Sequence, residues 1–245
     1  MLLYFIFILF SCLFIVAWLW RRHIKPYFAQ KALQHFFQSH PQGNLIATSM
    51  QFLNKLYAPI NGTYISQQER KRLKLEEDAF TYGEIDFITF MLIFSKIKVE
   101  DQEIFYDLGS GTGKVVFTVA LWGSFSKVYG IELLPGLHEI ASNQLEQAKI
   151  FLADDERMSK LQSIQFLQGD FKNIDFSDAD ILFINATCLS HPTWVLLLEK
   201  FSKLRTGARI IITTKKIPLK EFSLIYHDTI LMSWGLNSIN IYIKN

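Results

Sequence analysis

Residues 105–116, FYDLGSGTGKVV, place three glycines and a lysine directly after a short apolar run. Two phosphate-binding patterns fail on this segment. A P-loop requires G-x-x-x-x-G-K-[ST], but Leu108 stands at the first glycine and Val115 at the final Ser/Thr. The dinucleotide pattern G-x-G-x-x-G would place Lys114 or Val116 at its last glycine. The segment therefore predicts neither a P-loop nor a dinucleotide site.

The same residues fit a loop that binds S-adenosylmethionine (SAM), in which an apolar strand and an Asp precede G-x-G-x-G. Asp107 and the glycines at 109, 111 and 113 match it. SAM carries no phosphate, and its ribose and amino-acid part must lie close to backbone, which glycine permits. The Asp107 carboxylate can meet the ligand's ammonium. A tight strand-to-helix turn without a ligand is the alternative, but such a turn needs fewer glycines.

Further polar and aromatic residues stand where later strands are expected to end, and ligands of parallel sheets bind at those ends. Glu132, 23 residues after Gly109, can accept hydrogen bonds from both ribose hydroxyls. Asp170 can accept from the adenine amino group, and Phe171 can stack on the ring. Asn185 stands at the end of the next expected strand, where enzymes that transfer the methyl group of SAM normally place it. The alternatives are that Glu132 is a solvated acid, that Asp170 is a turn residue beside a core Phe171, and that Asn185 forms a turn.

Alternating strands and helices must position these residues. Apolar runs predict strands at 104–108, 127–132, 164–168, 179–185 and 208–214, with helices at 114–122, 136–152 and 191–204. Two more strand-like runs, 222–232 and 238–243, suggest a closing antiparallel hairpin. The alternation predicts an α/β fold, a seven-stranded mostly parallel sheet with helices on both faces. Class I SAM-dependent methyltransferases use this order of strands.

The residues before the first strand are expected to be mainly helical. Periodic apolar spacing predicts a helix at 45–60, and residues 81–99 begin with a turn and continue as an apolar helix. Residues 66–78 mix four basic with four acidic residues, which favours a solvated helix face over a nucleic-acid or membrane surface. The predicted organisation is a transmembrane anchor (1–20), a connector (21–44), a helical part with a cofactor-closing loop (45–103) and a SAM-binding α/β domain (104–245).

Residues 2–20 contain no charged side chain. As a helix they would span about 28 Å, close to the hydrocarbon thickness of a bilayer. Basic residues follow at once, from Arg21 to Lys25, and predict a single-pass anchor with the remaining chain facing the cytoplasm. A signal peptide would carry basic residues before the apolar run and an A-x-A-like site after it. A buried core helix is rarely apolar on every face over this length.

Composition excludes little else. The net charge of +2 in 245 residues gives no strong nucleic-acid signal. Cys12 and Cys188 are the two cysteines, too few for a disulfide framework or a cysteine zinc site. No H-x-x-x-H pair stands on a plausible helix, so no metal site is predicted.

Taken together, the motifs resemble the DOT1 family of histone lysine methyltransferases over about residues 45–245. The matching segments are Tyr82-Gly83-Glu84, similar to the loop that closes over the cofactor, Asp107 to Gly113, Gly130-Ile131-Glu132, Gly169-Asp170-Phe171, Phe183-Ile184-Asn185 and Ser233-Trp234-Gly235. Three positions depart from the family pattern: Ile85 after the Tyr-Gly-Glu turn, and Ala186 and Thr187 after the Asn that lines the lysine channel.

The resemblance implies transfer of a methyl group from SAM to a lysine of a protein, a histone being one possible substrate. It implies catalytic roles for Asn185 and Tyr82. The implied cofactor-binding residues are Tyr82, Gly83, Glu84, Asp107, Gly109, Ser110, Gly111, Gly113, Glu132, Asp170, Phe171 and Asn185. Two other functions stay open, a methyltransferase for a small molecule or lipid at the membrane and an inactive SAM-binding module that docks a partner.

Overall fold

The computed structural model describes most of the chain: residues 37–39, 43–74, 83–232 and 235–245. The chain divides into two compact units, Met1–Ser49 and Met50–Asn245, and the second contains every element of the sheet. The predicted anchor and Tyr82 lie outside the described residues. Within the described residues, no helix combines the length and the apolar character needed to cross a membrane.

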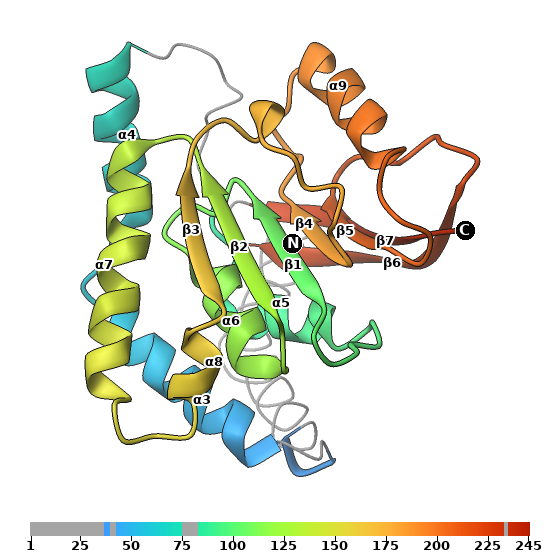
Figure 1. Cartoon of the computed structure of the whole chain (residues 1–245). Helices are drawn as coiled ribbons and strands as arrows, with labels where there is room; N and C mark the ends of the chain where they lie inside the picture. Colours follow the sequence, from blue (N-terminus) through green and yellow to red (C-terminus); the bar gives the residue numbers. More distant parts are fainter. Residues whose placement is uncertain (1–36, 40–42, 75–82, 233–234) are drawn as a thin grey trace, which may run out of the picture. The chain divides into compact units, whose positions relative to one another are not determined.

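Seven strands form one sheet in the order β3-β2-β1-β4-β5-β7-β6 (Figure 1). Their bounds are β1 Ile104–Leu108, β2 Lys127–Glu132, β3 Ile164–Gln168, β4 Ile181–Ile184, β5 Arg209–Thr213, β6 Phe222–Met232 and β7 Gly235–Lys244. The first five run parallel, β7 is antiparallel to β5, and β6 is antiparallel to β7. The predicted mostly parallel sheet with a closing hairpin is confirmed.

The helices follow the predicted alternation, with some different bounds. They are α3 Gly43–Tyr57, α4 Gly62–Leu73, α5 Phe87–Phe94, α6 Lys114–Trp122, α7 Pro135–Phe151, α8 Met158–Leu161 and α9 His191–Phe201, with a 3-10 turn η3 at Phe171–Asn173. Of the run expected at 81–99, the structure describes 83–99, and eight of those residues are helical. Asp86 sets the start of α5, because its carboxylate accepts from the backbone N–H of Thr89 at 2.9 Å.

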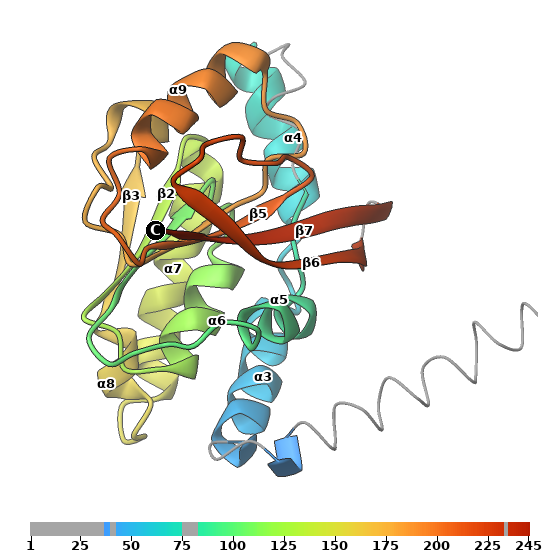
Figure 2. The ribbon, with the colours of Figure 1, turned by 90° about the vertical axis from the view of Figure 1, so that its right-hand side faces the viewer.

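The two faces of the sheet are buried under different helices, as the alternation of side chains along β1 shows. Tyr106 and Leu108 belong to the apolar cluster beneath α9. Phe105 points to the opposite face. There its ring meets that of Phe94, the last residue of α5, at a centroid distance of 6.1 Å. Asp107 shares the face of Phe105, so its carboxylate is directed away from α9. The helices α5 and α6 lie together in both ribbon views (Figure 2).

Candidate functional site

The glycine loop leaves β1 and turns tightly into α6. The backbone N–H groups of Gly109 and Ser110 both donate to the carbonyl of Ile131 in β2, at 2.9 and 3.0 Å. Gly109, Gly111 and Gly113 all have positive φ, +88°, +56° and +90°, a region that side chains disfavour. The first and last of the three nevertheless meet different surroundings.

A Cβ on Gly109 would have no atom within 4 Å, whereas one on Gly113 would lie 2.6 Å from the ring of Phe166 in β3. Gly109 therefore keeps space open. Gly113 is required because α6 packs closely against β3.

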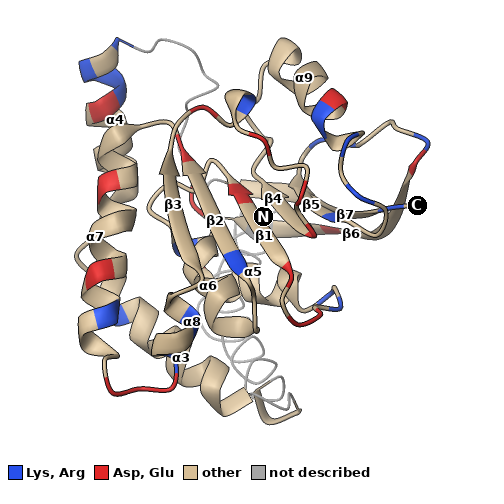
Figure 3. Ribbon diagram, viewed as in Figure 1, with Lys and Arg blue, Asp and Glu red and all other residues tan. Residues whose placement is uncertain are grey.

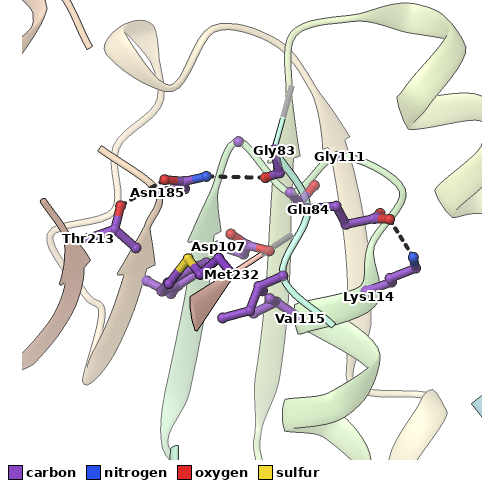
Figure 4. A pocket seen from close by; sticks show the side chains of 13 residues that line it. Gly83, Glu84, Asp107, Gly111, Lys114, Val115, Asn185, Thr213 and Met232 are labelled. Carbon is purple, nitrogen blue, oxygen red and sulfur yellow. Dashed lines mark hydrogen bonds and ion pairs between the residues drawn. The ribbon is translucent and has the colours of Figure 1, made fainter. Parts of the chain in front are cut away.

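A pocket lies above this loop, at the carboxyl ends of the parallel strands (Figure 4). The residues that line it come from the segment before α5, from β1, the glycine loop and the start of α6, from β4 and the residue after it, and from β5 and β6. They are Gly83, Glu84, Ile85, Asp107, Gly109, Ser110, Gly111, Lys114, Val115, Phe183, Asn185, Thr213 and Met232.

Buried acids give this end of the sheet a negative character. Asp107 is 2% exposed and Glu132 is 7% exposed. Burial, with Glu132 and Glu84 nearby, raises the pKa of Asp107 well above its usual value. Burial also raises the pKa of Glu132, although backbone N–H donors act against it. Acidic segments mark the same ends of the central strands in Figure 3. Ionised carboxylates gathered here would favour a cationic ligand.

Glu132 supports the glycine loop by accepting hydrogen bonds from backbone N–H groups. One carboxylate oxygen accepts from the backbone N–H of Gly111 and the other from that of Leu134, both at 2.8 Å. Glu132 does not line the pocket. The backbone N–H of Leu133 is a third donor. A carboxylate has about four acceptor positions, so one remains for a ligand's hydroxyl group.

Glu84 ties the segment before α5 to the first turn of α6. Its carboxylate accepts from the hydroxyl of Thr112 and forms an ion pair with Lys114. The Lys114 ammonium also lies over the ring of Tyr57, 5.6 Å from its centre. The Tyr57 hydroxyl donates to the carbonyl of Thr112 at 2.6 Å. These contacts hold Gly83 and Glu84 beside the pocket (Figure 4).

Asn185 follows β4 and contacts the same segment from the opposite wall. Its amide nitrogen donates to the carbonyl of Gly83 at 3.1 Å. Its amide oxygen accepts from the hydroxyls of Thr213 at 2.7 Å and Thr187 at 2.8 Å. The pocket is therefore bounded on one side by the glycine loop and on the other by this amide.

The structure brings together many of the residues predicted from the sequence. Those that line the pocket are Gly83, Glu84, Asp107, Gly109, Ser110, Gly111 and Asn185, and those that do not are Gly113, Glu132, Asp170 and Phe171. Asp170 caps the 3-10 turn by accepting from the backbone N–H of Lys172 at 2.9 Å, and its carboxylate pairs with the ammonium of the same lysine at 3.1 Å. Phe171 packs, partly buried, against the cluster beneath α9.

Six residues that line the pocket were not predicted as site residues: Ile85, Lys114, Val115, Phe183, Thr213 and Met232. Lys114 carried a usable signal, because it is the first helical residue after the glycine loop. Thr213 and Met232 come from the ends of β5 and β6, and no local pattern marks either of them. No group of metal-ligating side chains occurs among the described residues.

The chemistry of these groups fits SAM, which has two cationic centres, a sulfonium and an ammonium, and one carboxylate. Buried acids suit the cations, and Lys114 at the start of α6 suits the carboxylate. The hydroxyl of Ser110 is buried without a hydrogen-bond partner among the described residues, so it offers a polar group to a ligand.

Comparison with known proteins agrees with this arrangement. A protein of Caenorhabditis elegans described as "Histone-lysine N-methyltransferase, H3 lysine-79 specific" is 28% identical over 153 residues, 61% of this chain and 16% of that protein. A "Protein-lysine N-methyltransferase" of Saccharolobus islandicus is 25% identical over 114 residues, 46% of this chain and 63% of that protein. This chain thus covers less than two thirds of either relative.

The crystal structure of the tRNA methyltransferase TrmK of B. subtilis superposes with a TM-score of 0.50 at 15% identity, covering 67% of each chain, which supports the fold alone. The sequence profile of the family described as "Histone methylation protein DOT1" matches residues 64–237. That match spans most of the sheet together with the pocket, and the chain belongs to the DOT1 family.

Proposed function

We propose that this protein is a SAM-dependent protein-lysine N-methyltransferase. The observation that carries the proposal is the pocket itself, which joins the glycine loop, buried Asp107 and Asn185 in a chain of the DOT1 family. SAM, when bound, would supply a methyl group on a sulfonium. A neutral amine would form the C–N bond in line as the C–S bond breaks, leaving the thioether S-adenosylhomocysteine and a methylated ammonium that releases a proton. The protein contributes binding, alignment and exclusion of water.

Three charged residues divide the recognition of the cofactor. Asp107 takes the ammonium, since its buried carboxylate has two acids nearby and gains most from a cation. Lys114 takes the carboxylate, because it is the first residue of α6, where an anion is favoured, although its ammonium also pairs with Glu84. Glu132 accepts from a ribose hydroxyl with the acceptor position that its three backbone N–H donors leave open. Asp170 and Phe171 are proposed for the adenine.

The acceptor is proposed to enter beside Asn185. A lysine reacts as the neutral amine, and an apolar, half-enclosed site lowers the pKa of an ammonium. Phe183 and Met232 supply such a surface at this end of the pocket. The two relatives named above are described as acting on lysine in a protein, which supports a protein substrate. A histone is one candidate, as the first of those descriptions suggests.

A small molecule or lipid is the second candidate acceptor. Residues 2–20 form an uncharged run followed by basic residues, which supports a single-pass membrane anchor with the catalytic domain facing the cytoplasm. An anchored enzyme meets lipid headgroups at high local concentration. Extraction of cell membranes with alkaline carbonate tests the anchor: an anchored chain stays in the pellet, and a peripheral one is released.

Methyl-labelled SAM tests the activity and the acceptor together. The full chain, purified in detergent, is incubated with nucleosomes, free histones, a total bacterial lysate and a lipid extract, with Asp107→Asn as the control expected to lose the label. Label on a histone supports a histone-lysine enzyme, and label on another protein keeps lysine chemistry with a different substrate. Label in the lipid alone supports the second candidate. A wild-type chain that neither binds SAM nor transfers label contradicts the proposal.

A further inference from the structure

The amide of Asn185 has its acceptor positions filled. An amide oxygen has two lone pairs, and the hydroxyls of Thr213 and Thr187 occupy them at 2.7 and 2.8 Å. The amide nitrogen donates to the carbonyl of Gly83 at 3.1 Å. The oxygen therefore cannot receive an incoming amine without losing one of its hydroxyl partners. In this arrangement Asn185 holds Gly83 rather than the substrate.

The orientation of that amide follows from Gly83 and Thr213 together. The Thr213 hydroxyl is buried and accepts from the backbone N–H of Ala186 at 2.9 Å. The Gly83 carbonyl can only accept, so the Asn185 nitrogen must face it and the amide oxygen must face Thr213 (Figure 4). Because Ala186 donates to the Thr213 hydroxyl, that hydroxyl's own hydrogen is free to bond the amide oxygen and hold this orientation.

The bond to Gly83 joins residues 102 positions apart in the chain. Gly83 lies next to Glu84, which the Lys114 ion pair fixes at the glycine-loop side of the pocket. The segment is thus attached to both walls, at Lys114 on one side and at Asn185 on the other. Release of either contact would free one end of the segment that borders the pocket.

We propose that Thr213 is a positioning residue, which keeps the Asn185 amide turned toward Gly83 and so retains the cofactor in its pocket. This rests on the proposed function, because the retained ligand is SAM. Thr213 acts through Asn185 and the segment that Asn185 holds. Its loss is expected to speed the departure of SAM more than it slows methyl transfer from bound SAM.

The test compares Thr213→Val, which keeps the shape of the side chain and removes the hydroxyl, with Thr213→Ser, which keeps the hydroxyl. The full chain is used in detergent, with the SAM dissociation constant and dissociation rate measured directly and kcat and KM for SAM measured with labelled cofactor. Thr213→Val is expected to raise the dissociation constant and KM about tenfold, which corresponds to about 1.4 kcal/mol, with kcat within about twofold. Thr213→Ser is expected to stay within about twofold of wild type in all four.

Thr118→Val is the matched control. Thr118 is also fully buried, and its hydroxyl donates to the carbonyl of Lys114 at 2.9 Å within α6. That carbonyl keeps its helical N–H donor when the hydroxyl is removed, so SAM affinity is expected to stay unchanged.

A double-mutant cycle separates positioning from a general loss of packing. In an Asn185→Leu background, which lacks the amide, Thr213→Val is expected to have no further effect on the SAM dissociation constant. An equal effect in both backgrounds overturns the proposal, as does unchanged SAM release in Thr213→Val. If Thr213→Val does not fold, Asn185→Leu alone decides, because an unchanged dissociation rate there excludes the contact with Gly83. A wild-type chain that fails to bind SAM refutes the proposed function instead.

Discussion

Gly109 and Gly113 occupy equivalent positions of one motif, yet the structure gives them different roles. Both have φ near +90°, +88° and +90°, so alanine at either position forces a side chain into left-handed backbone, at about 1–2 kcal/mol. The added methyl group of Gly109→Ala would meet nothing within 4 Å. That of Gly113→Ala would lie 2.6 Å from Cζ of Phe166 and 3.3 Å from Cβ of Ala141.

The extra crowding at Gly113 sets the expected difference in stability. Overpacking a well-packed core costs about 1–3 kcal/mol, which adds to the backbone term for a total of about 2–5 kcal/mol. For a domain of about 150–250 residues each kcal/mol lowers Tm by about 2–4 °C. Gly113→Ala should therefore melt about 2–12 °C below Gly109→Ala.

Thermal unfolding followed by circular dichroism measures this difference, and SAM titration supplies the second readout. Gly109 lines the pocket and Gly113 does not, so Gly109→Ala should lose more SAM affinity although it loses less stability. Replacing Phe166 by Leu in the Gly113→Ala protein should recover part of the lost stability, because the ring atoms that clash are removed. Equal melting temperatures for the two alanine variants, or strict additivity with Phe166→Leu, would refute this assignment.

The pocket's charged residues give further predictions. Because the pKa of Asp107 is raised, SAM affinity should increase as pH rises through that pKa, and Asp107→Asn should flatten the dependence in titrations at several pH values. Without SAM, the contribution of Asp107 to the free energy of unfolding should be highest below its unfolded pKa of about 3.9 and decrease as pH rises toward the folded value, since the folded state then holds the extra proton; unfolding of wild type and Asp107→Asn across pH checks the sign. Lys114→Met should raise the SAM dissociation constant about tenfold by removing the proposed partner of the cofactor carboxylate, with Lys149→Met on α7 as the control. Glu132→Ala should weaken SAM binding at least about tenfold and also lower the free energy of unfolding by about 2–6 kcal/mol, because two buried N–H groups lose their acceptor; urea unfolding measures the second effect.

The elements from β1 to β3 could be predicted closely from the sequence. β1 and β2 have the predicted bounds, and α6 begins and ends as expected, because each apolar run is short and bounded by glycine or polar residues. The strand predicted at 179–185 is shorter, Ile181–Ile184. The chain leaves the ladder after Ile184, where the backbone N–H of Ala186 donates to the side-chain hydroxyl of Thr213 and not to a strand carbonyl.

The sequence predicted less well how the site residues face one another. Glu132 was identified as a site residue, but its contact with Gly111 depends on the return of the glycine loop over the end of β2. Thr213 reaches the pocket because β5 lies beside β4. Met232 reaches it because β6, the first strand of the β6–β7 hairpin, ends at the pocket. Such contacts depend on strand order and register, which a local pattern does not encode.

The buried acids explain why a chain would keep a destabilising arrangement at this place. Burial raises the pKa of both Asp107 and Glu132, so in the absence of a cation each is harder to ionise in the folded protein than in the unfolded chain. A ligand with an ammonium and a sulfonium reverses this preference, because it supplies the missing positive charge where water is excluded. Binding of such a ligand should therefore release protons, and calorimetric titration in buffers of different ionisation enthalpy measures their number. Proton release that persists in Asp107→Asn would assign the titrating group to Glu132. If the wild type releases no protons near the raised pKa of Asp107, the pairing of Asp107 with the ligand's ammonium is contradicted.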